Sequence, residues 1–339
     1  MYALSFLRTV HGVTCMQTFH IRACFAAVLC ATVFALLPFA HAQSYPSKPV
    51  RIILPYLGAT EFAGRWLAAK IAPGLGQQVI VDTRLGAGGK IGHEQLVKSA
   101  PDGYTLMLGA PPMVINPHLY PVAGQDALRD YAPIALLGTI PSVLAVHPSV
   151  PVKTLRELVQ LAQKNPGRLT YGSGAPGSPS HLAGELLKSL GKINFLMVPY
   201  KGASFALIGA MSGEVDMVIP GASAVEPYVK DKRMRALAIL HTKPVDSLPG
   251  VPTAAEAGMP QFQIVNWFVL TAPAGTPQAI IERLNSEVTK VMQSAESRKH
   301  FAALGGDVTT TTPGEATAFV RDEYLRWGKV ISDANIKAE

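Results

Sequence analysis

Short β-branched runs alternate with amphipathic stretches along this chain, and this alternation limits the fold more than any other sequence feature. The first block reads strand, helix, strand, helix, strand over residues 50–55, 63–75, 78–83, 92–99 and 104–109. A second block repeats the order over residues 143–147, 154–165, 170–172, 180–190 and 195–198. The order predicts two α/β units, each with a mostly parallel sheet covered by helices on both faces.

Residues at the helix ends support this reading. Thr154 and Glu157 have the spacing of a capping box, in which the Thr hydroxyl accepts from the Glu amide and the Glu carboxylate reaches back. Pro277 stands in the first turn of a helix expected over residues 278–294, where its missing N–H costs nothing. Pro313 begins the last predicted helix.

The N-terminal segment has the layout of a secretory leader. Basic residues precede a thirteen-residue run, 25–37, that is apolar except for Thr32, and Ala40-His41-Ala42 then offers a cleavage site. A membrane anchor is the alternative, but thirteen helical residues at ~1.5 Å each fall short of a hydrocarbon core of ~30 Å. A lipoprotein leader needs a Cys after the cleavage point, where Gln43 stands. We therefore expect residues 1–42 to be removed on export to the periplasm.

Cysteine content and charge narrow the chemistry further. All three cysteines, Cys15, Cys24 and Cys30, lie in the leader, so the mature chain has no disulfide and no thiolate metal site. Removing residues 1–42 leaves 28 basic and 23 acidic residues, a net charge of +5. The basic residues stand singly, unlike the clusters of nucleic-acid binders, so the charge favours small organic anions as partners.

Known catalytic and nucleotide-binding motifs fail on spacing. Gly86-Ala87-Gly88-Gly89-Lys90 is followed by Ile91 where a P-loop needs Ser or Thr, and Gly88 and Gly92 stand one residue too far apart for a dinucleotide fingerprint. The histidines are isolated in sequence, and no Gly-x-Ser-x-Gly elbow occurs. We expect no metal, no cofactor and no enzyme activity, with an enzyme assembled from distant loops as the weakest alternative.

Loops that follow predicted strands are the candidate binding sites, because ligands of open α/β sheets bind beyond the carboxyl ends of the strands. The first such loop supplies Tyr56, Gly58, Ala59 and Thr60. Its backbone amides and the Thr60 hydroxyl can hold a carboxylate. An ordinary turn capped by Thr60 explains the same residues equally well.

Two further loops lie in the second block. Residues 172–181 combine three glycines with three serines at the start of a helix, which suits an anion, although a flexible connector is the alternative. The candidates there are Ser173, Gly174, Gly177, Ser178, Ser180 and His181. The third loop contains Tyr200, Lys201 and Gly202. Lys201 either complements a carboxylate or is a solvated lysine in a turn.

Several motifs, taken together, resemble one protein family. They are Val50 to Pro55, Gly86-Ala87-Gly88-Gly89, Pro101-Asp102-Gly103-Tyr104-Thr105-Leu106, Val198-Pro199-Tyr200-Lys201-Gly202, Pro252 to Gly258 and Ala272-Pro273-Ala274-Gly275-Thr276-Pro277. In this order they resemble the Bug family of periplasmic solute receptors, the binding proteins of tripartite tricarboxylate transporters. The resemblance runs from about residue 45 to residue 339.

The resemblance implies an α/β fold of the type II periplasmic-binding-protein class, with a ligand cleft and two crossover segments. Domain 1 then comprises residues 43–142 and 268–339, and domain 2 comprises residues 143–267. Closure around the ligand is a hinge motion. By the same resemblance, Ala110 and Pro111 form a further ligand-binding loop.

One departure from the family pattern concerns the first loop, which is shorter by about two residues and keeps only Gly58 as a glycine. Fewer backbone amides then face the ligand, so we expect a reshaped pocket. The leading hypothesis is a monomeric receptor for a small carboxylate that serves membrane transporter subunits. The alternative is a sensor that presents its ligand to a signalling partner, such as a sensor ectodomain.

Overall fold

The computed structural model describes residues 45–120, 126, 128–174, 178–333 and 335–336. The predicted leader, residues 1–42, and the candidate Gly177 lie outside the described residues. None of the helices within the described ranges is both long enough and apolar enough to cross a membrane.

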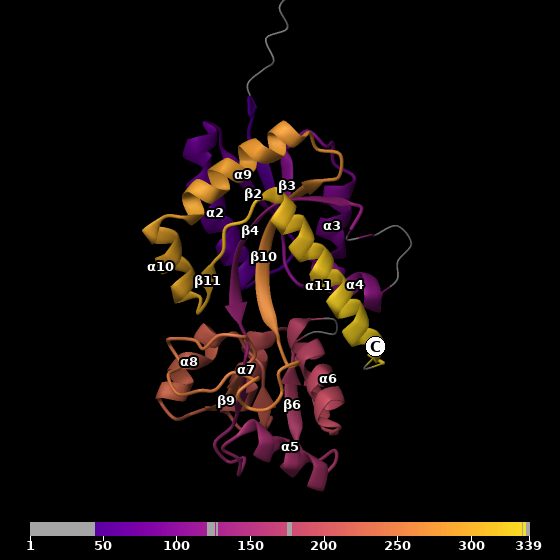
Figure 1. The fold of residues 1–339 in the computed structure, drawn as a ribbon, viewed down its shortest axis with the longest axis vertical. Helices are drawn as coiled ribbons and strands as arrows, with labels where there is room; N and C mark the ends of the chain where they lie inside the picture. Colours follow the sequence, from indigo (N-terminus) through magenta and orange to yellow (C-terminus); the bar gives the residue numbers. More distant parts are fainter. Residues whose placement is uncertain (1–44, 121–125, 127, 175–177, 334, 337–339) are drawn as a thin grey trace, which may run out of the picture. The chain divides into compact units, whose positions relative to one another are not determined.

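Strands and helices alternate through the described chain (Figure 1). The strands are β1 Val50–Leu54, β2 Val79–Thr83, β3 Thr105–Gly109, β4 Tyr131–Pro141, β5 Val143–Val146, β6 Thr170–Ser173, β7 Leu196–Pro199, β8 Met217–Val218, β9 Arg235–Ile239, β10 Val265–Pro273 and β11 Asp307–Val308. The helices are α2 Ala59–Leu75, η1 Ala87–Gly89, α3 Lys90–Val97, α4 Pro112–Leu119, α5 Leu155–Lys164, α6 Pro179–Gly191, α7 Ala203–Met211, α8 Ala222–Lys230, α9 Gln278–Met292, α10 Ala295–Ala303 and α11 Pro313–Asp333.

The strands form two sheets, which confirms the predicted α/β class. Six strands make the first sheet in the order β11-β4-β10-β3-β1-β2, and five make the second in the order β7-β6-β8-β5-β9. The prediction of mostly parallel sheets is wrong, because the pairing is mixed. Strand β1 is parallel to β2 and β3, and β6 is parallel to β7 and β8. Antiparallel pairs join β10 to β3 and β4, β11 to β4, and β5 to β8 and β9.

The two long strands β4 and β10 take part in every antiparallel pair of the first sheet. They run side by side in opposite directions, with Tyr131 opposite Pro273 and Pro141 opposite Val265 (Figure 1). Strand β4 leads directly into β5 of the second sheet, and β10 returns the chain to the first. The domain limits at 142/143 and 267/268 remain predictions. The chain passes from the first sheet to the second between β4 and β5, and β10, the next strand of the first sheet, begins at Val265.

Successive side chains of the buried strand β1 enter different cores, as the two-residue period of a strand requires. Ile52 and Leu54 pack in the core that includes Leu67 of α2 and Leu284 of α9. Ile53 faces the opposite way, into the core that includes Leu96 of α3. Helices therefore cover both faces of the first sheet.

The second sheet is also covered on both faces. On one face its core contains Leu158 of α5 and Leu182 of α6, and on the other Leu207 of α7 and Val225 of α8. The predicted cap of α5 is confirmed, because the Thr154 hydroxyl accepts from the Glu157 amide at 3.1 Å. The Glu157 carboxylate accepts from the Lys153 amide at 2.6 Å, one residue before the cap.

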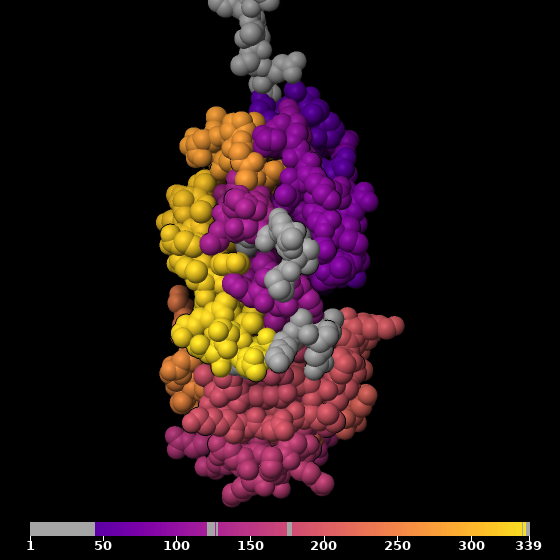
Figure 2. Space-filling model, turned by 90° about the vertical axis from the view of Figure 1, so that its right-hand side faces the viewer, coloured from indigo at the N-terminus to yellow at the C-terminus, as the bar shows by residue number. Residues whose placement is uncertain are grey.

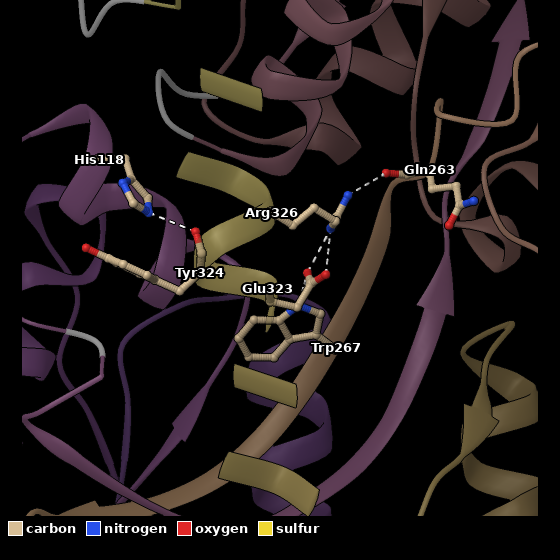
Figure 3. Close-up of polar contacts among 6 residues, drawn as sticks. All are labelled: His118, Gln263, Trp267, Glu323, Tyr324 and Arg326. Carbon is tan, nitrogen blue, oxygen red and sulfur yellow. Dashed lines mark hydrogen bonds and ion pairs between the residues drawn. The ribbon is translucent and has the colours of Figure 1, made fainter. Parts of the chain in front are cut away.

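The C-terminal helix α11 is hydrogen-bonded to α4, to β10 and to Gln263 just before β10 (Figure 3). Trp267 Nε1 donates to Glu323 Oε2 at 2.9 Å, and Arg326 pairs with the same carboxylate at 2.7 and 3.0 Å. Arg326 Nη1 also donates to the Gln263 carbonyl at 3.3 Å. His118 Nε2 of α4 lies 2.9 Å from the Tyr324 carbonyl (Figure 3). In Figure 2, yellow atoms of the C-terminal part of the chain lie beside magenta atoms from its first half.

Candidate functional site

Three connections of the first sheet lie at one edge. Strands β2 and β3 flank β1 and are parallel to it, so the loops that follow all three strands leave from the same edge. The predicted residues Tyr56 to Thr60 follow β1, and Ala110 and Pro111 follow β3. The glycine turn at residues 86–89, which sequence reasoning rejected as a nucleotide loop, follows β2 and joins them.

The β1–α2 connection presents backbone amides. Gly58 is the N-cap residue of α2 and adopts φ 75°, and no side chain caps this helix end within the described chain. Thr60 is buried inside the first turn, so the alternative of an ordinary turn capped by Thr60 is wrong. The amides of Ala59, Thr60 and Glu61 lack intrahelical acceptors by their position in the first turn. This connection can therefore donate to an anion.

Tyr56 belongs to a hydrogen-bonded trio. Its hydroxyl lies 2.6 Å from His93 Nε2, and His93 Nδ1 lies 2.8 Å from the Tyr131 hydroxyl. Burial lowers the pKa of His93 to about 4, so the ring is neutral. Burial, and secondarily Tyr131, raises the pKa of Tyr56 well above its usual value. Sequence reasoning missed His93 and Tyr131, because they stand far from Tyr56 along the chain.

The turn at residues 86–89 holds the Tyr56 ring. A Cβ at Gly89 would lie 2.8 Å from Tyr56 Cζ, so only glycine lets the ring lie there, and Gly89 also has φ 95°. Asn116 of α4 donates to the Gly88 carbonyl at 2.7 Å. The spacing of these glycines after a strand was the available sequence signal.

Ala110 and Pro111 contribute backbone rather than functional side chains. Both are buried, and the Ala110 carbonyl accepts from the Met113 amide at 2.8 Å. Pro111 is the N-cap residue of α4, and no side chain caps that helix end in the described part of the chain. Their placement beside the β1–α2 connection fits their predicted role without testing it.

Serine hydroxyls gather where β6 leads into α6. Ser178 is the N-cap residue, and its Oγ accepts from the His181 amide at 3.3 Å. Ser178 Oγ lies 3.2 Å from Ser180 Oγ, which accepts from the Gly174 amide at 2.8 Å. The buried Ser173 hydroxyl instead donates to the Gly174 carbonyl at 3.0 Å.

A count of hydrogens shows what this cluster can donate. Ser178 and Ser180 have two hydroxyl hydrogens, and one of them makes the bond between the two residues. The other has no acceptor among the described residues, whichever serine carries it, so it is available to a ligand. The hydrogen of Ser173 is already used. The structure therefore favours Ser178 and Ser180 over Ser173 as ligand donors.

The third predicted loop follows β7, beside β6. The Tyr200 amide donates to the Ser173 carbonyl at 2.9 Å, which ties this loop to the serine loop. The Tyr200 hydroxyl lies against Gly209 of α7, so this group points into the helix layer. Lys201 is exposed and precedes Gly202, the N-cap residue of α7. The predicted residues thus form two groups, one on each sheet.

Metal chemistry has no support in the described residues, where no cluster of three or more His, Cys, Asp or Glu side chains is placed to hold an ion. His181 is buried at the start of α6. The two groups offer amide and hydroxyl donors, which suit an anionic ligand.

Comparison with known proteins agrees with this chemistry. Residues 63–336 match the family described as the tripartite tricarboxylate transporter family receptor. Protein BugT of Bordetella pertussis is 35% identical over 300 residues, which cover 87% of this chain and 92% of BugT.

Solved structures agree as well. An R. palustris protein solved with adipate is 31% identical, with a TM-score of 0.78, and the match covers 86% of this chain and 99% of that one. MatC from Rhodopseudomonas palustris, with bound malate, is 29% identical, with a TM-score of 0.75, over 85% of this chain and all of MatC. The predicted resemblance is confirmed, and so is the prediction of a receptor rather than an enzyme. The chain belongs to the tripartite tricarboxylate transporter receptor family.

Proposed function

We propose that this protein is a periplasmic receptor that binds a small carboxylate and delivers it to the membrane subunits of a tripartite tricarboxylate-type transporter. The match of residues 63–336 to the receptor family carries the proposal. Relatives solved with adipate and with malate support a carboxylate ligand.

The local chemistry supports the same ligand class. On the first sheet, the amides at the start of α2 and the Tyr56 hydroxyl are donors. On the second sheet, the Ser178 and Ser180 hydroxyls leave one hydrogen without an acceptor among the described residues, and Lys201 adds an exposed positive charge. Hydrogen bonds to a charged group contribute about 1.5–3 kcal/mol each, so three or four of them support micromolar binding after ordering costs.

Isothermal titration calorimetry tests the proposal. The full chain is expressed with its own N-terminal segment and recovered from the periplasm of a bacterial host. It is then titrated with adipate, malate, citrate, a monocarboxylate and the diamide of adipate. We expect micromolar binding of at least one di- or tricarboxylate and no binding of the diamide. Diamide binding equal to that of adipate would refute a carboxylate receptor.

The same preparation tests the leader. Mass spectrometry of the recovered protein should give the mass of a chain that begins at Gln43. A chain that retains residues 1–42 would contradict cleavage after Ala42, and it would leave the binding result unaffected.

A further inference from the structure

The trio of Tyr56, His93 and Tyr131 connects the candidate site to the interior of the first sheet. Tyr56 follows β1 in the first candidate loop and is the most exposed member of the trio. His93 on α3 is 4% exposed, and Tyr131 at the start of β4 is 8% exposed. The two bonds, at 2.6 and 2.8 Å, use both ring nitrogens of His93.

The hydrogens of this trio can be counted. The neutral ring of His93 has one N–H, and each tyrosine has one O–H, which makes three hydrogens for two hydrogen bonds. One hydroxyl hydrogen is therefore left over. It belongs to Tyr131 if Nδ1 carries the ring hydrogen, and to Tyr56 if Nε2 carries it.

The surroundings of the two tyrosines decide between these tautomers. The Tyr131 hydroxyl is buried, and within the described chain it has no hydrogen-bonding neighbour besides His93. The nearby Asp130 carboxylate instead accepts from Arg129 Nε and the Asp126 amide. A free hydrogen on Tyr131 would thus be an unsatisfied buried donor, which costs free energy. At the half-buried Tyr56, a ligand or water can accept it.

The position of the Tyr56 hydroxyl is also fixed. Gly89 lies against the Tyr56 ring and leaves no space for a Cβ between them. The His93 ring packs edge-on against the Tyr131 ring, with 5.7 Å between ring centroids and 71° between ring planes. A hydroxyl oxygen that accepts from an N–H donor becomes a stronger donor itself.

We propose that His93 is a positioning residue for ligand binding: its Nε2–H donates to the Tyr56 oxygen and leaves the Tyr56 hydrogen to a carboxylate oxygen of the ligand. The proposal rests on the proposed function, because it assigns one donor of that binding site. It predicts that the Tyr56 hydroxyl contributes less to ligand affinity when His93 is replaced, although Tyr56 itself is unchanged.

Calorimetry on single and double variants tests this coupling. We expect Tyr56→Phe to weaken binding of the best carboxylate at least tenfold, His93→Leu to weaken it by a similar factor, and the double variant to add little. His93→Gln keeps an N–H donor and should retain more affinity than His93→Leu. The matched control is Tyr45→Phe, which removes a hydroxyl that donates to the Gly103 carbonyl at 2.6 Å, and its affinity should match the wild type.

Nitrogen-15 NMR of histidine-labelled wild-type protein reads the tautomer of the His93 ring directly. The His93 signals, identified by their absence in His93→Gln, should show a protonated Nε2 and a bare Nδ1. A protonated Nδ1, or unchanged affinity in Tyr56→Phe, would overturn this inference alone. A wild-type chain that binds no carboxylate overturns the proposed function and, with it, the ligand-directed role of Tyr56.

Discussion

Ser178 has two proposed roles, as a helix cap and as a ligand donor, and comparison with a substitution at Thr154 separates them. Its Oγ caps α6 by accepting from the His181 amide at 3.3 Å, and it belongs to the serine pair proposed to donate to the ligand. Thr154 caps α5 in the same way, by accepting from the Glu157 amide at 3.1 Å, but it lies outside both groups of site residues. Ser178→Ala and Thr154→Ala therefore both remove a helix cap, but only Ser178→Ala also removes a proposed hydrogen bond to the ligand.

The shared loss is a helix cap, worth about 1 kcal/mol. For a chain of this length, a loss of that size lowers the melting temperature by about 2 °C. The additional loss in Ser178→Ala is a hydrogen bond to a charged ligand, worth about 1.5–3 kcal/mol, which corresponds to roughly a 10- to 150-fold weaker affinity.

Thermal unfolding of both ligand-free variants and calorimetry with the best carboxylate measure the two losses. We expect similar drops in melting temperature, with a change in dissociation constant only for Ser178→Ala. Ser178→Gly, which retains a favourable N-cap residue, should lose only a few tenths of a kcal/mol of stability and still bind poorly. Wild-type affinity in Ser178→Ala would refute Ser178 as a ligand donor, because the Ser180 hydroxyl keeps its own hydrogen in that variant.

Three further predictions concern stability, measured by urea unfolding. The folded-state pKa of His93, about 4, lies below its ordinary value of about 6.5, so the neutral ring contributes stability that is complete above pH 6.5. The free energy of unfolding should fall by about 3 kcal/mol from this source as the pH drops to 4. A His93→Phe variant should lack this fall, and equal slopes of unfolding free energy against pH in the variant and the wild type would contradict it. Gly138→Ala should destabilise by about 1–3 kcal/mol, because its Cβ would lie 2.6 Å from Phe301 Cδ1 and 2.5 Å from a backbone oxygen, whereas Gly314→Ala, with open space around it, should change little. Glu323→Ala should lower the free energy of unfolding by about 1–3 kcal/mol more than Glu323→Gln does, because only the alanine leaves the buried indole N–H of Trp267 without an acceptor. Equal losses of stability in the two variants would contradict that account.

Local sequence patterns were sufficient for the α/β class and for most of the first block. Hydrophobic runs gave β1 and β3 to within a residue or two, and Thr154 identified the start of α5. These features depend on neighbours close along the chain, so a sequence displays them directly.

Elements whose form depends on distant partners escaped prediction. The antiparallel pairing of β4 with β10 joins segments about 130 residues apart, and no local period encodes strand direction. Helix α4 contains Pro117, which obscures a helical pattern. Helix α7 is apolar on its exposed side as well, at Phe205 and Ile208, so it shows no amphipathic period.

For the candidate site, sequence reasoning named candidate loops but could not assign donors within them. Ser173, Ser178 and Ser180 look alike in sequence. In the structure, the Ser173 hydroxyl donates to the Gly174 carbonyl, whereas the other two serines share one hydrogen that has no acceptor in the part of the chain that the structure describes. That distinction depends on hydrogen-bond geometry, which residue types alone do not contain.

The trio around His93 also bears on the shortened first loop. A loop with Gly58 as its only glycine offers fewer amides than the family pattern implies, yet the adjacent Tyr56 has a hydrogen directed away from His93 under the proposed tautomer. Among the described residues, the serine pair on the second sheet likewise leaves one hydroxyl hydrogen without an acceptor. Under these proposals, each sheet offers a hydroxyl donor besides the backbone amides, and Lys201 adds a positive charge on the second sheet. We therefore expect a dicarboxylate, which has an acceptor group at each end, to bind more tightly than a monocarboxylate of similar length.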